Sequence, residues 1–471
     1  MERAEAEAIY AAGREAVVEV LLAMDRRIAQ LEARVEQLER RVGRNSRNSS
    51  SPPSEDPPSS PPRRRGKDRS GRPPGGQSGH EGHGRELLPA WAVDELVDYW
   101  PVSCDCGHAF TEAERVAARE PARHQVEELP QIAVRVTEHR WQRVRCPGCG
   151  TERTGELPAE VGGSAFGPRL QAAVAALSVR NRVSRRDLVE LCEELFGARI
   201  SAGAIDAILA RAGDALEQPY EQLLSRMRRS RALNVDETGW RLKGGQRTLW
   251  GAFTEQVAVF KITANRHEQH LRELLSGHQG IVTSDRWWAY DHLPLRRRQI
   301  CWSHLQRDFQ AQAEGSGAER ELGQAGLRVC ERVFWAWEVY QHTHDRHQLQ
   351  LTIRGLRREL KPILHQYRGK APLYKRSRGL ARNLLKAWPA LWTFTERPGV
   401  TPTNNHAERG LRGAVIYRKL SLGSQSHAGE RRTERLLSAS ISCRLQQRSL
   451  FAYLAELLDN HARGDPLPQL A

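Results

Sequence analysis

The hydrophobic positions near the start of the chain follow a heptad pattern. From residue 17 to residue 42 they recur at alternating steps of four and three, the spacing of a coiled-coil seam. The seam consists of Val17, Leu21, Met24, Ile28, Leu31, Val35, Leu38 and Val42. Arginines and acids flank it in positions that suit a parallel two-stranded coil. Residues 1–45 are therefore predicted to form a dimerising helix through 17–42, the alternative being an amphipathic helix packed on its own domain.

The pattern breaks off in residues 46–90, which contain few apolar side chains and are rich in Pro, Ser, Gly and Arg. Such a stretch cannot bury enough surface to offset its chain entropy, so a disordered basic linker is expected. Its arginine-containing stretches resemble the extended protein arms that lie along a DNA minor groove. The alternative is a solvated linker that only gives reach.

Two cysteine pairs mark residues 91–160, each followed by glycine and separated by the β-like segment 132–145. Cys104 with Cys106 and Cys146 with Cys149 suit a tetrahedral, structural Zn²⁺ in a zinc ribbon that binds DNA. The first pair has only one residue between its cysteines, and His108 is a substitute ligand. The alternative is four reduced cysteines.

Helical periodicity returns in residues 161–230. Stretches 169–179, 184–196 and 202–215 carry apolar stripes, with Ser184 and Ser201 as caps and Gly197 as a stop. The short turn between the second and third has the proportions of a helix-turn-helix. An α-helical connector is equally compatible with the pattern.

Residues 231–310 switch to β-like runs. One run is expected to end on Asp236 and then turn, and another, 280–285, ends on Asp285. Between them lie strands at 248–254 and 257–262 and a helix at 266–275. This order, three meandering strands, a helix and a strand carrying the second aspartate, predicts the first part of a ribonuclease-H-like α/β core.

A third acid, Glu408, falls on a predicted helix in residues 403–471, which complete the core and add closing helices. Asn404 or Asn405 is expected to cap that helix and to offer contacts to DNA, together with Arg409, Arg412, Arg418 and Lys419. If Asp236, Asp285 and Glu408 converge, they can hold divalent ions for in-line phosphoryl transfer. The alternative is that both aspartates are turn residues and Glu408 pairs with Arg412.

Residues 311–402 separate the second and third acids and are predicted to form a helical insertion. Trp335, Trp337, Trp388 and Trp392 are its expected core anchors. From Arg354 to Lys386 there are eleven Lys or Arg and a single acid, Glu359. Such a surface can hold donor DNA through its phosphates, the alternative being a solvated helix face.

Composition narrows the class of protein. The 471 residues carry a net charge of +15, with a pI near 9.8, which favours nucleic acid as the partner. No apolar run is long enough to span a membrane, and the N-terminus lacks a signal-peptide design, so a cytoplasmic protein is expected. In that setting the close cysteine pairs indicate metal rather than disulfides.

Four motifs give a more specific indication. VDETGW, TSDRWWAY, CWSHLQRDF and TNNHAERGLRGAVIYRKLSLGS resemble the DDE transposases of the insertion sequence 66 family. The resemblance extends upstream through RNSRNSSSPPSED, GRPPGGQSGHEGH and the paired cysteines, from about residue 25 to residue 465. It implies a Mg²⁺- or Mn²⁺-dependent transposase with a ribonuclease-H-like core. Asp236, Asp285 and Glu408 match the family's acidic triad, and the irregular first cysteine pair departs from the pattern.

The sequence therefore predicts a multidomain α+β transposase. It would bind the terminal inverted repeats of its element, cleave the ends and join them to target DNA, with companion proteins of the same element as further partners. Two alternatives remain open: a DNA-binding regulatory protein with an inactive core, and a nuclease that hydrolyses without joining.

Overall fold

The computed structural model describes residues 8, 10–42, 86–115, 122–130, 132–158, 161, 163–375 and 377–470. By its internal contacts the chain divides into two compact units. One comprises Met1–Ser60, Val136–Glu194 and Ala198–Ala471, and the other Pro61–Arg135 and Leu195–Gly197. Most of the predicted linker, up to residue 85, lies outside the described residues.

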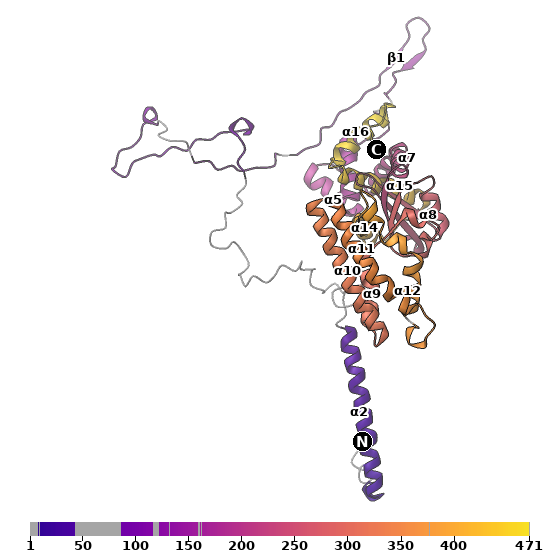
Figure 1. The fold of residues 1–471 in the computed structure, drawn as a ribbon. Helices are drawn as coiled ribbons and strands as arrows, with labels where there is room; N and C mark the ends of the chain where they lie inside the picture. Colours follow the sequence, from indigo (N-terminus) through magenta and orange to yellow (C-terminus); the bar gives the residue numbers. More distant parts are fainter. Residues whose placement is uncertain are drawn as a thin grey trace. The chain divides into compact units, whose positions relative to one another are not determined.

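A single long helix, α2 (Arg14–Val42), covers the stretch with the heptad pattern (Figure 1). Four of its seam residues are exposed, among them Leu21 at 59% and Ile28 at 52%, whereas Val17 is half-buried. A stripe of exposed leucine and isoleucine on one helix face normally covers a partner surface. The coiled coil itself remains a prediction.

The cysteine-bearing region has little regular structure. It contains the 3₁₀ turns η2 (Ala90–Ala92) and η3 (Glu112–Glu114) and an antiparallel pair, β1 (Arg143–Arg145) with β2 (Glu152–Thr154). The strand expected across 132–145 is therefore wrong for all but its last three residues. None of the described residues in 86–158 is buried, so alternating hydrophobic residues there have no surface to pack against.

Four helices precede the sheet: α4 (Pro168–Val179), α5 (Arg185–Phe196), α6 (Ala202–Ala215) and α7 (Glu217–Arg228). The first three lie where the sequence predicts them. Ser184 and Ser201 accept hydrogen bonds from the backbone amides of Asp187 and Ala204, as caps do. Gly197 has a φ of +63°, a conformation that suits glycine at a helix end.

Three of these helices, α4, α6 and α7, pack on the C-terminal part of the chain. Helix α6 contacts α4, α15 (His427–Leu445) and α16 (Leu450–Arg463). Among the exposed residues of α6, Ala202, Gly203, Ala207 and Asp214, there is no basic side chain. A recognition helix needs donors or cations on its free face, and the helix-turn-helix at this place stays a prediction.

A five-stranded mixed sheet has the order β5-β4-β3-β6-β7. Its strands are β3 (Ala232–Leu242), β4 (Gly245–Phe253), β5 (Ala258–Thr263), β6 (Ile281–Ser284) and β7 (Arg298–Ile300). The first three form an antiparallel meander, whereas β6 and β7 run parallel to β3. Helix α8 (Glu268–Leu274) leads into β6, and α9 (Trp302–Ala313) follows β7.

The first strand is longer than the sequence suggests. We expected it to end on Asp236 and turn, but β3 continues to Leu242 and turns at Lys243 and Gly244, both with positive φ. A two-residue hairpin loop of this kind matches the twist of the strands that it joins. The expectation was wrong because a second alternation, of Thr238, Trp240 and Leu242, follows the acidic pair on the face of the strand opposite to Leu233 and Val235. Asp236 therefore lies within a strand and not at its end.

Helices α14 (Asn405–Ser421) and α15 cover the meander. Helix α14 packs on β3 and β4, while α15 packs on the outer strand β5. Three side chains of α15 accept hydrogen bonds from backbone amides of β5: Glu434, Ser438 and Ser442. The edge of the sheet at β5 is thereby covered, so its backbone amides are not free to pair with a strand of another chain.

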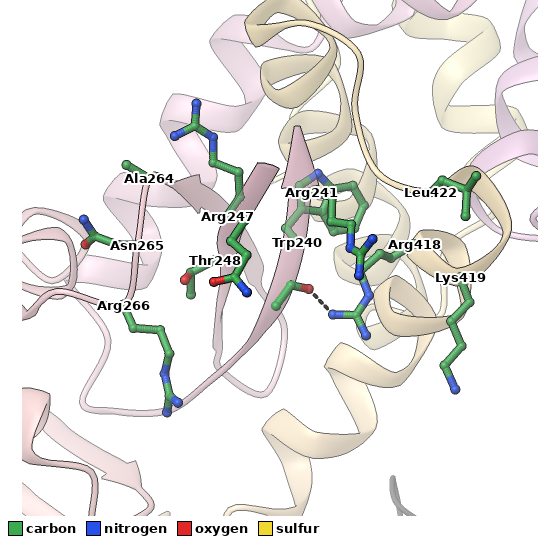
Figure 2. Close-up of a pocket in the computed structure, with 12 residues that line it drawn as sticks. Trp240, Arg241, Arg247, Thr248, Ala264, Asn265, Arg266, Arg418, Lys419 and Leu422 are labelled. Atoms are coloured by element: carbon green, nitrogen blue, oxygen red, sulfur yellow. Dashed lines mark hydrogen bonds between the residues drawn. The ribbon is translucent and has the colours of Figure 1, made fainter. Parts of the chain in front are cut away.

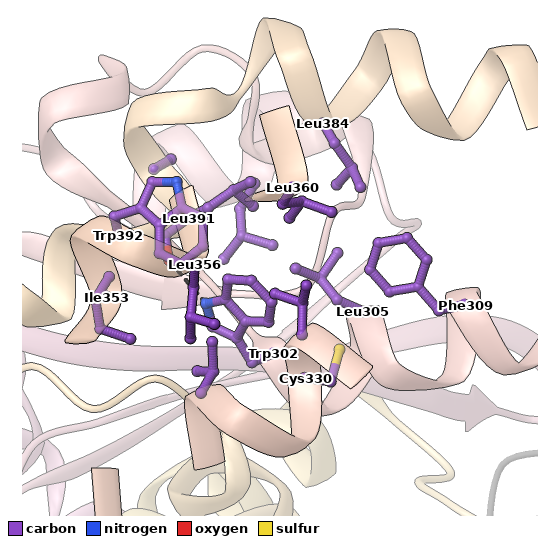
Figure 3. Close-up of a cluster of buried hydrophobic side chains, with 14 of the residues drawn as sticks. Trp302, Leu305, Phe309, Cys330, Ile353, Leu356, Leu360, Leu384, Leu391 and Trp392 are labelled. Atoms are coloured by element: carbon purple, nitrogen blue, oxygen red, sulfur yellow. Dashed lines mark hydrogen bonds between the residues drawn. The ribbon is translucent and has the colours of Figure 1, made fainter. Parts of the chain in front are cut away.

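The predicted insertion is helical and has its own core (Figure 3). It comprises α10 (Ala318–Thr343), α11 (Arg346–Tyr367), the turns η6 (Pro372–Tyr374) and η7 (Trp388–Leu391), α12 (Ser377–Lys386) and α13 (Thr393–Glu396). Trp392 is 1% exposed and lies 4.9 Å from the ring of Trp302, which joins this core to α9. Trp335 is 59% exposed, so its prediction as a core anchor was wrong.

The observed architecture is thus mixed α+β. None of the helices in the described ranges is both long enough and apolar enough to cross a bilayer.

Candidate active site

Two of the predicted acids lie side by side in the middle of the sheet. Strands β3 and β6 are parallel neighbours, and Asn234 is level with Thr283. Asp236 and Asp285 each follow two residues later, so they reach the same level on neighbouring chain segments, which lie about 4.8 Å apart in a sheet. Pairing between the two strands stops before this level, although β3 stays paired with β4. The two carboxylates therefore lie just beyond the last paired residues of β3 and β6.

The third acid is brought to them by a buried amide. Asn404 is fully buried just before α14, and its Nδ2 donates to the carbonyl of Val235 over 2.8 Å. Its Oδ1 accepts from Asn234 Nδ2 over 2.9 Å. Because these contacts lie next to Asp236, they hold the first turn of α14, and with it Glu408, against β3. Asn404 takes the N-cap position of α14 as expected, but its side chain makes no cap hydrogen bond.

Close packing fixes the same helix against β4. A Cβ added at Gly410 of α14 would lie 2.3 Å from the Phe253 ring, so only glycine allows this approach. His406 Nε2 lies 2.8 Å from the carbonyl of Thr254 and donates to it. The position of Glu408 thus depends on the small residue two positions after it.

Gly410→Ala is expected to destabilise the protein by about 1–3 kcal/mol, because the buried Phe253 ring must shift. It should also displace Glu408, which lies two positions earlier on the same helix. Gly413→Ala is the matched control: its nearest neighbours lie at ordinary contact distances of 3.5 Å or more, so the better helix former should be neutral or stabilising by about 1 kcal/mol. Urea unfolding of both variants measures the difference. Equal stabilities would contradict the packing argument.

The electrostatics of the site show that the acids share one location. The pKa of Asp236 is raised well above its usual range, chiefly by burial and further by the charges of Glu237, Asp285 and Glu408. Burial also raises the pKa of Asp285. A hydrogen bond from the backbone amide of Trp287 and the charges of nearby arginines lower this pKa, but burial has the larger effect. The buried carboxylates repel each other because their negative charges lie close together. A bound cation would offset this repulsion.

Two acids of the site have cationic or polar partners. Glu237 lies beside the guanidinium of Arg266 and accepts a 3.0 Å hydrogen bond from the Tyr290 hydroxyl. Glu408 lies 3.8 Å from Arg307, on α9, and 3.7 Å from His304 Nδ1. Burial and the charges of Arg307 and Arg286 lower the pKa of His304 to about 3, so its ring is neutral at pH 7. The alternative, an ion pair of Glu408 with Arg412, is not among the ion pairs of the described residues, and Glu408 instead lies near His304 and Arg307 of α9.

The donor set fits a hard divalent cation in part. Within the described ranges no group of three or more His, Cys, Asp and Glu side chains is arranged to hold a metal ion. Magnesium is commonly held by one or two carboxylates together with waters and substrate phosphates, not by a closed protein cage. Neighbouring carboxylates such as Asp236 and Asp285 are compatible with that form of binding.

The residues predicted to contact DNA divide into two groups. Arg409, Arg412 and Lys419 are exposed on α14 and available to a ligand. Asn404 is buried, and Asn405 Oδ1 accepts from Ser303 over 3.3 Å, so these amides serve contacts within the protein.

Arg418 is half-buried and donates to Thr238 Oγ1 over 3.2 Å and to the carbonyl of Gly239. Arg418 therefore links the end of α14 to β3 through hydrogen bonds. It also lines a pocket between these two elements.

Sequence reasoning missed several residues of the site. Glu237 was passed over because Asp236 precedes it, although an acid next to a predicted catalytic aspartate was itself a signal. Arg266, Tyr290 and Arg307 carry no local signal, because only the tertiary structure brings them to the acids.

The cysteine pairs form two similar turns. The amide of Cys104 bonds to the carbonyl of His108 over 2.9 Å, and the amide of Cys146 bonds to the carbonyl of Thr151 over 2.9 Å. Gly107 and Gly150 have positive φ in these turns. Hydrogen bonds lower the pKa of Cys104, chiefly from the Cys106 backbone amide, and that of Cys149, chiefly from the Thr151 hydroxyl. Easier formation of thiolates suits metal binding.

The fold is mixed α+β, and carboxylates gather where two parallel strands of its sheet end their pairing. Such a cluster of acids is typical of an enzyme active site. Residues 163–432, more than half of the chain, match the model of the transposase IS66 family, and the chain belongs to this family. Membership implies a DNA-processing enzyme.

Two further similarities are weaker. Residues 2–86 match a family of unknown function (DUF6444). An uncharacterized protein, y4hP, of Sinorhizobium fredii (strain NBRC 101917 / NGR234) is 24% identical over 233 residues, covering 44% of this chain and 42% of that protein. The chain thus spans less than half the length of that relative.

Proposed function

We propose that the protein is a DDE-type transposase that cleaves the ends of its insertion sequence and joins them to target DNA. The observation that carries this proposal is the level position of Asp236 and Asp285, beside the helix that carries Glu408, in a member of the transposase IS66 family. The strand order, a meander followed by two parallel strands, supports a ribonuclease-H-like core. Asp236, Asp285 and Glu408 are its proposed catalytic residues.

The same three carboxylates would hold Mg²⁺ or Mn²⁺. When bound, the metal supplies Lewis-acid stabilisation of the reacting phosphate and activation of the attacking oxygen. The chain's own contribution is to keep the carboxylates in register: Asn404 fixes α14 on β3, and the β3–β6 pairing sets the two aspartates level. Arg307 stands by Glu408 and can bind a phosphate oxygen when DNA is present.

The other parts of the chain have proposed roles in binding. The exposed apolar stripe of α2 supports dimerisation through residues 17–42. The basic face of the insertion supports binding of donor DNA through phosphates. The paired cysteine turns support a structural Zn²⁺ at Cys104, Cys106, Cys146 and Cys149, because segments without a buried core often depend on metal for order.

Metal-dependent cutting tests the proposal. A labelled duplex that carries the inverted repeat flanking the chain's own gene should be nicked at the repeat end in Mg²⁺ and remain intact in EDTA. Cleavage of equal rate in EDTA would contradict a metal-dependent acidic centre. Binding of the duplex without cutting would favour the alternative of a regulatory DNA-binding protein with an inactive core.

A further inference from the structure

A basic pocket lies beside the acidic site and has no role in the chemistry proposed above (Figure 2). It measures about 870 Å³ and is formed by the β3–β4 hairpin, the segment after β5 and the end of α14. Five of its lining residues are cationic and none is acidic: Arg241, Arg247, Arg266, Arg418 and Lys419. Figure 2 shows Arg266 on one wall and Arg418 with Lys419 on the other.

The walls of this pocket are firmly built. After α14 the chain pairs with the hairpin, where the amide of Ser424 donates to the carbonyl of Arg241 over 2.9 Å. Trp240 is buried beneath, stacked on Tyr417 and bonded through Nε1 to Ser424 Oγ over 3.2 Å. A Cβ at Gly423 would lie 2.3 Å from the carbonyl of Arg241, so this close approach requires glycine.

The cations of the pocket are only partly neutralised by the protein. Arg247 lies 3.4 Å from Glu430, and Arg266 pairs with Glu237. Among the residues described by the structure, Arg241 and Lys419 have no recorded acidic partner within ion-pair distance. Burial lowers the pKa of Arg418, and the charge of Arg241 lowers it further, because the two cations face each other. An anion between them would relieve this repulsion.

The position of the pocket relates it to the acidic site. Arg266 lines the pocket and also contacts Glu237, the neighbour of Asp236. Along β3, Asp236 and Arg241 are about 17 Å apart at ~3.3 Å per residue. That distance corresponds to roughly five base steps of duplex DNA at ~3.4 Å each. Because Arg266 lies at both places and this spacing is short, backbone phosphates of a DNA that reaches the acids are within reach of the pocket.

The sheet order separates this pocket from the basic insertion. The pocket adjoins β3, β4 and β5, whereas the core of the insertion packs against residues of β6 and β7. Asp236, on β3, and Asp285, directly after β6, stand between the two. A DNA crossing the acids would have one arm towards each basic surface.

We infer that this pocket binds the phosphate backbone of the DNA arm opposite the one held by the insertion. The inference rests on the proposed function and adds a second, separate contact region for DNA. Its ligand is a series of phosphodiester groups, because the lining offers point charges and guanidinium forks but few groups able to distinguish bases.

The test compares two double variants with the same loss of charge. Arg241→Gln/Lys419→Gln removes two exposed pocket cations that pair with no acid among the described residues, and Arg444→Gln/Arg463→Gln removes two exposed cations from α15 and α16. Each full-length protein is titrated with the repeat-carrying duplex over a range of salt concentrations in EDTA, so that no cutting intervenes. Loss of two phosphate contacts should reduce the slope of log affinity against log salt by about 2, and the control should keep the wild-type slope.

A second readout locates the contacts. Single neutral methylphosphonate linkages are placed along the duplex on each side of the cleavage position. In wild type, neutral linkages on both sides should weaken binding, whereas the pocket variant should lose the effect on one side only. An unchanged slope, an equal change in the control variant, or a uniform loss on both sides would overturn the inference. A wild-type chain that binds no DNA would overturn the proposed function as well, which distinguishes the two failures.

Discussion

Asp236→Asn should lower strand cleavage by at least about a thousandfold while the affinity for end DNA stays within a few-fold of wild type. The expected loss corresponds to ~4 kcal/mol of transition-state stabilisation, as expected when a metal ligand is removed from a phosphoryl-transfer site. Affinity should persist because phosphate contacts by Lys and Arg supply most of the binding free energy, and none of them is changed. Gel-based cleavage and fluorescence anisotropy on the same labelled duplex measure both quantities.

The matched control for that variant is Asp291→Asn. Asp291 also follows β6, but it pairs with Arg298 at 2.8 Å and Lys386 at 3.2 Å and is not among the charges that raise the pKa of Asp236. Its cleavage rate should stay within a few-fold of wild type. Wild-type cleavage by Asp236→Asn, or equal losses in both variants, would mean that the acidic centre is not the site of chemistry.

Leu21→Glu/Ile28→Glu should convert a dimer into a monomer. Both side chains lie on the exposed stripe of α2, and in a coiled coil each glutamate would be buried against the partner at a cost of several kcal/mol. Light scattering should give twice the chain mass of 53.3 kDa for wild type and the single mass for the variant.

Ala23→Glu/Gln30→Glu adds glutamates at the same heptad spacing on the outer face of α2, where both residues are exposed. This control should remain dimeric. If wild type is a monomer, or if the core variant keeps the wild-type mass, the helix does not mediate dimerisation.

The sequence predicted those parts of the fold that depend on local pattern. The helices at 169–179 and 202–215 and the strands β4 and β5 follow from apolar periodicity and serine caps, and they lie close to where they are expected. The extent of β3 was wrong because the apolar positions change from one face of the strand to the other at Asp236 and Glu237, although the strand continues to Leu242. The strand expected at 132–145 failed because alternation predicts a strand only when a surface exists for one face to pack against.

The candidate site was predictable only in its acids. Asp236, Asp285 and Glu408 stand in recognisable motifs, but the groups that surround them come from distant parts of the chain. Arg266 reaches Glu237 from the segment after β5, and Asn404 turns its amide towards Val235 instead of capping its own helix. Contacts between residues so far apart in the sequence cannot be predicted from the spacing of neighbouring residues. The basic pocket, shared by a hairpin and the far end of α14, is invisible to sequence for the same reason.

The most direct test of the central claim is strand joining. The full-length protein is incubated in Mg²⁺ with a supercoiled plasmid and a labelled duplex whose repeat already ends in a free 3′-hydroxyl. A transposase should transfer the label covalently to the plasmid in wild type and fail to do so in Asp236→Asn and in EDTA. Cutting of end DNA without any transfer of the label would contradict the transposase assignment and identify a nuclease.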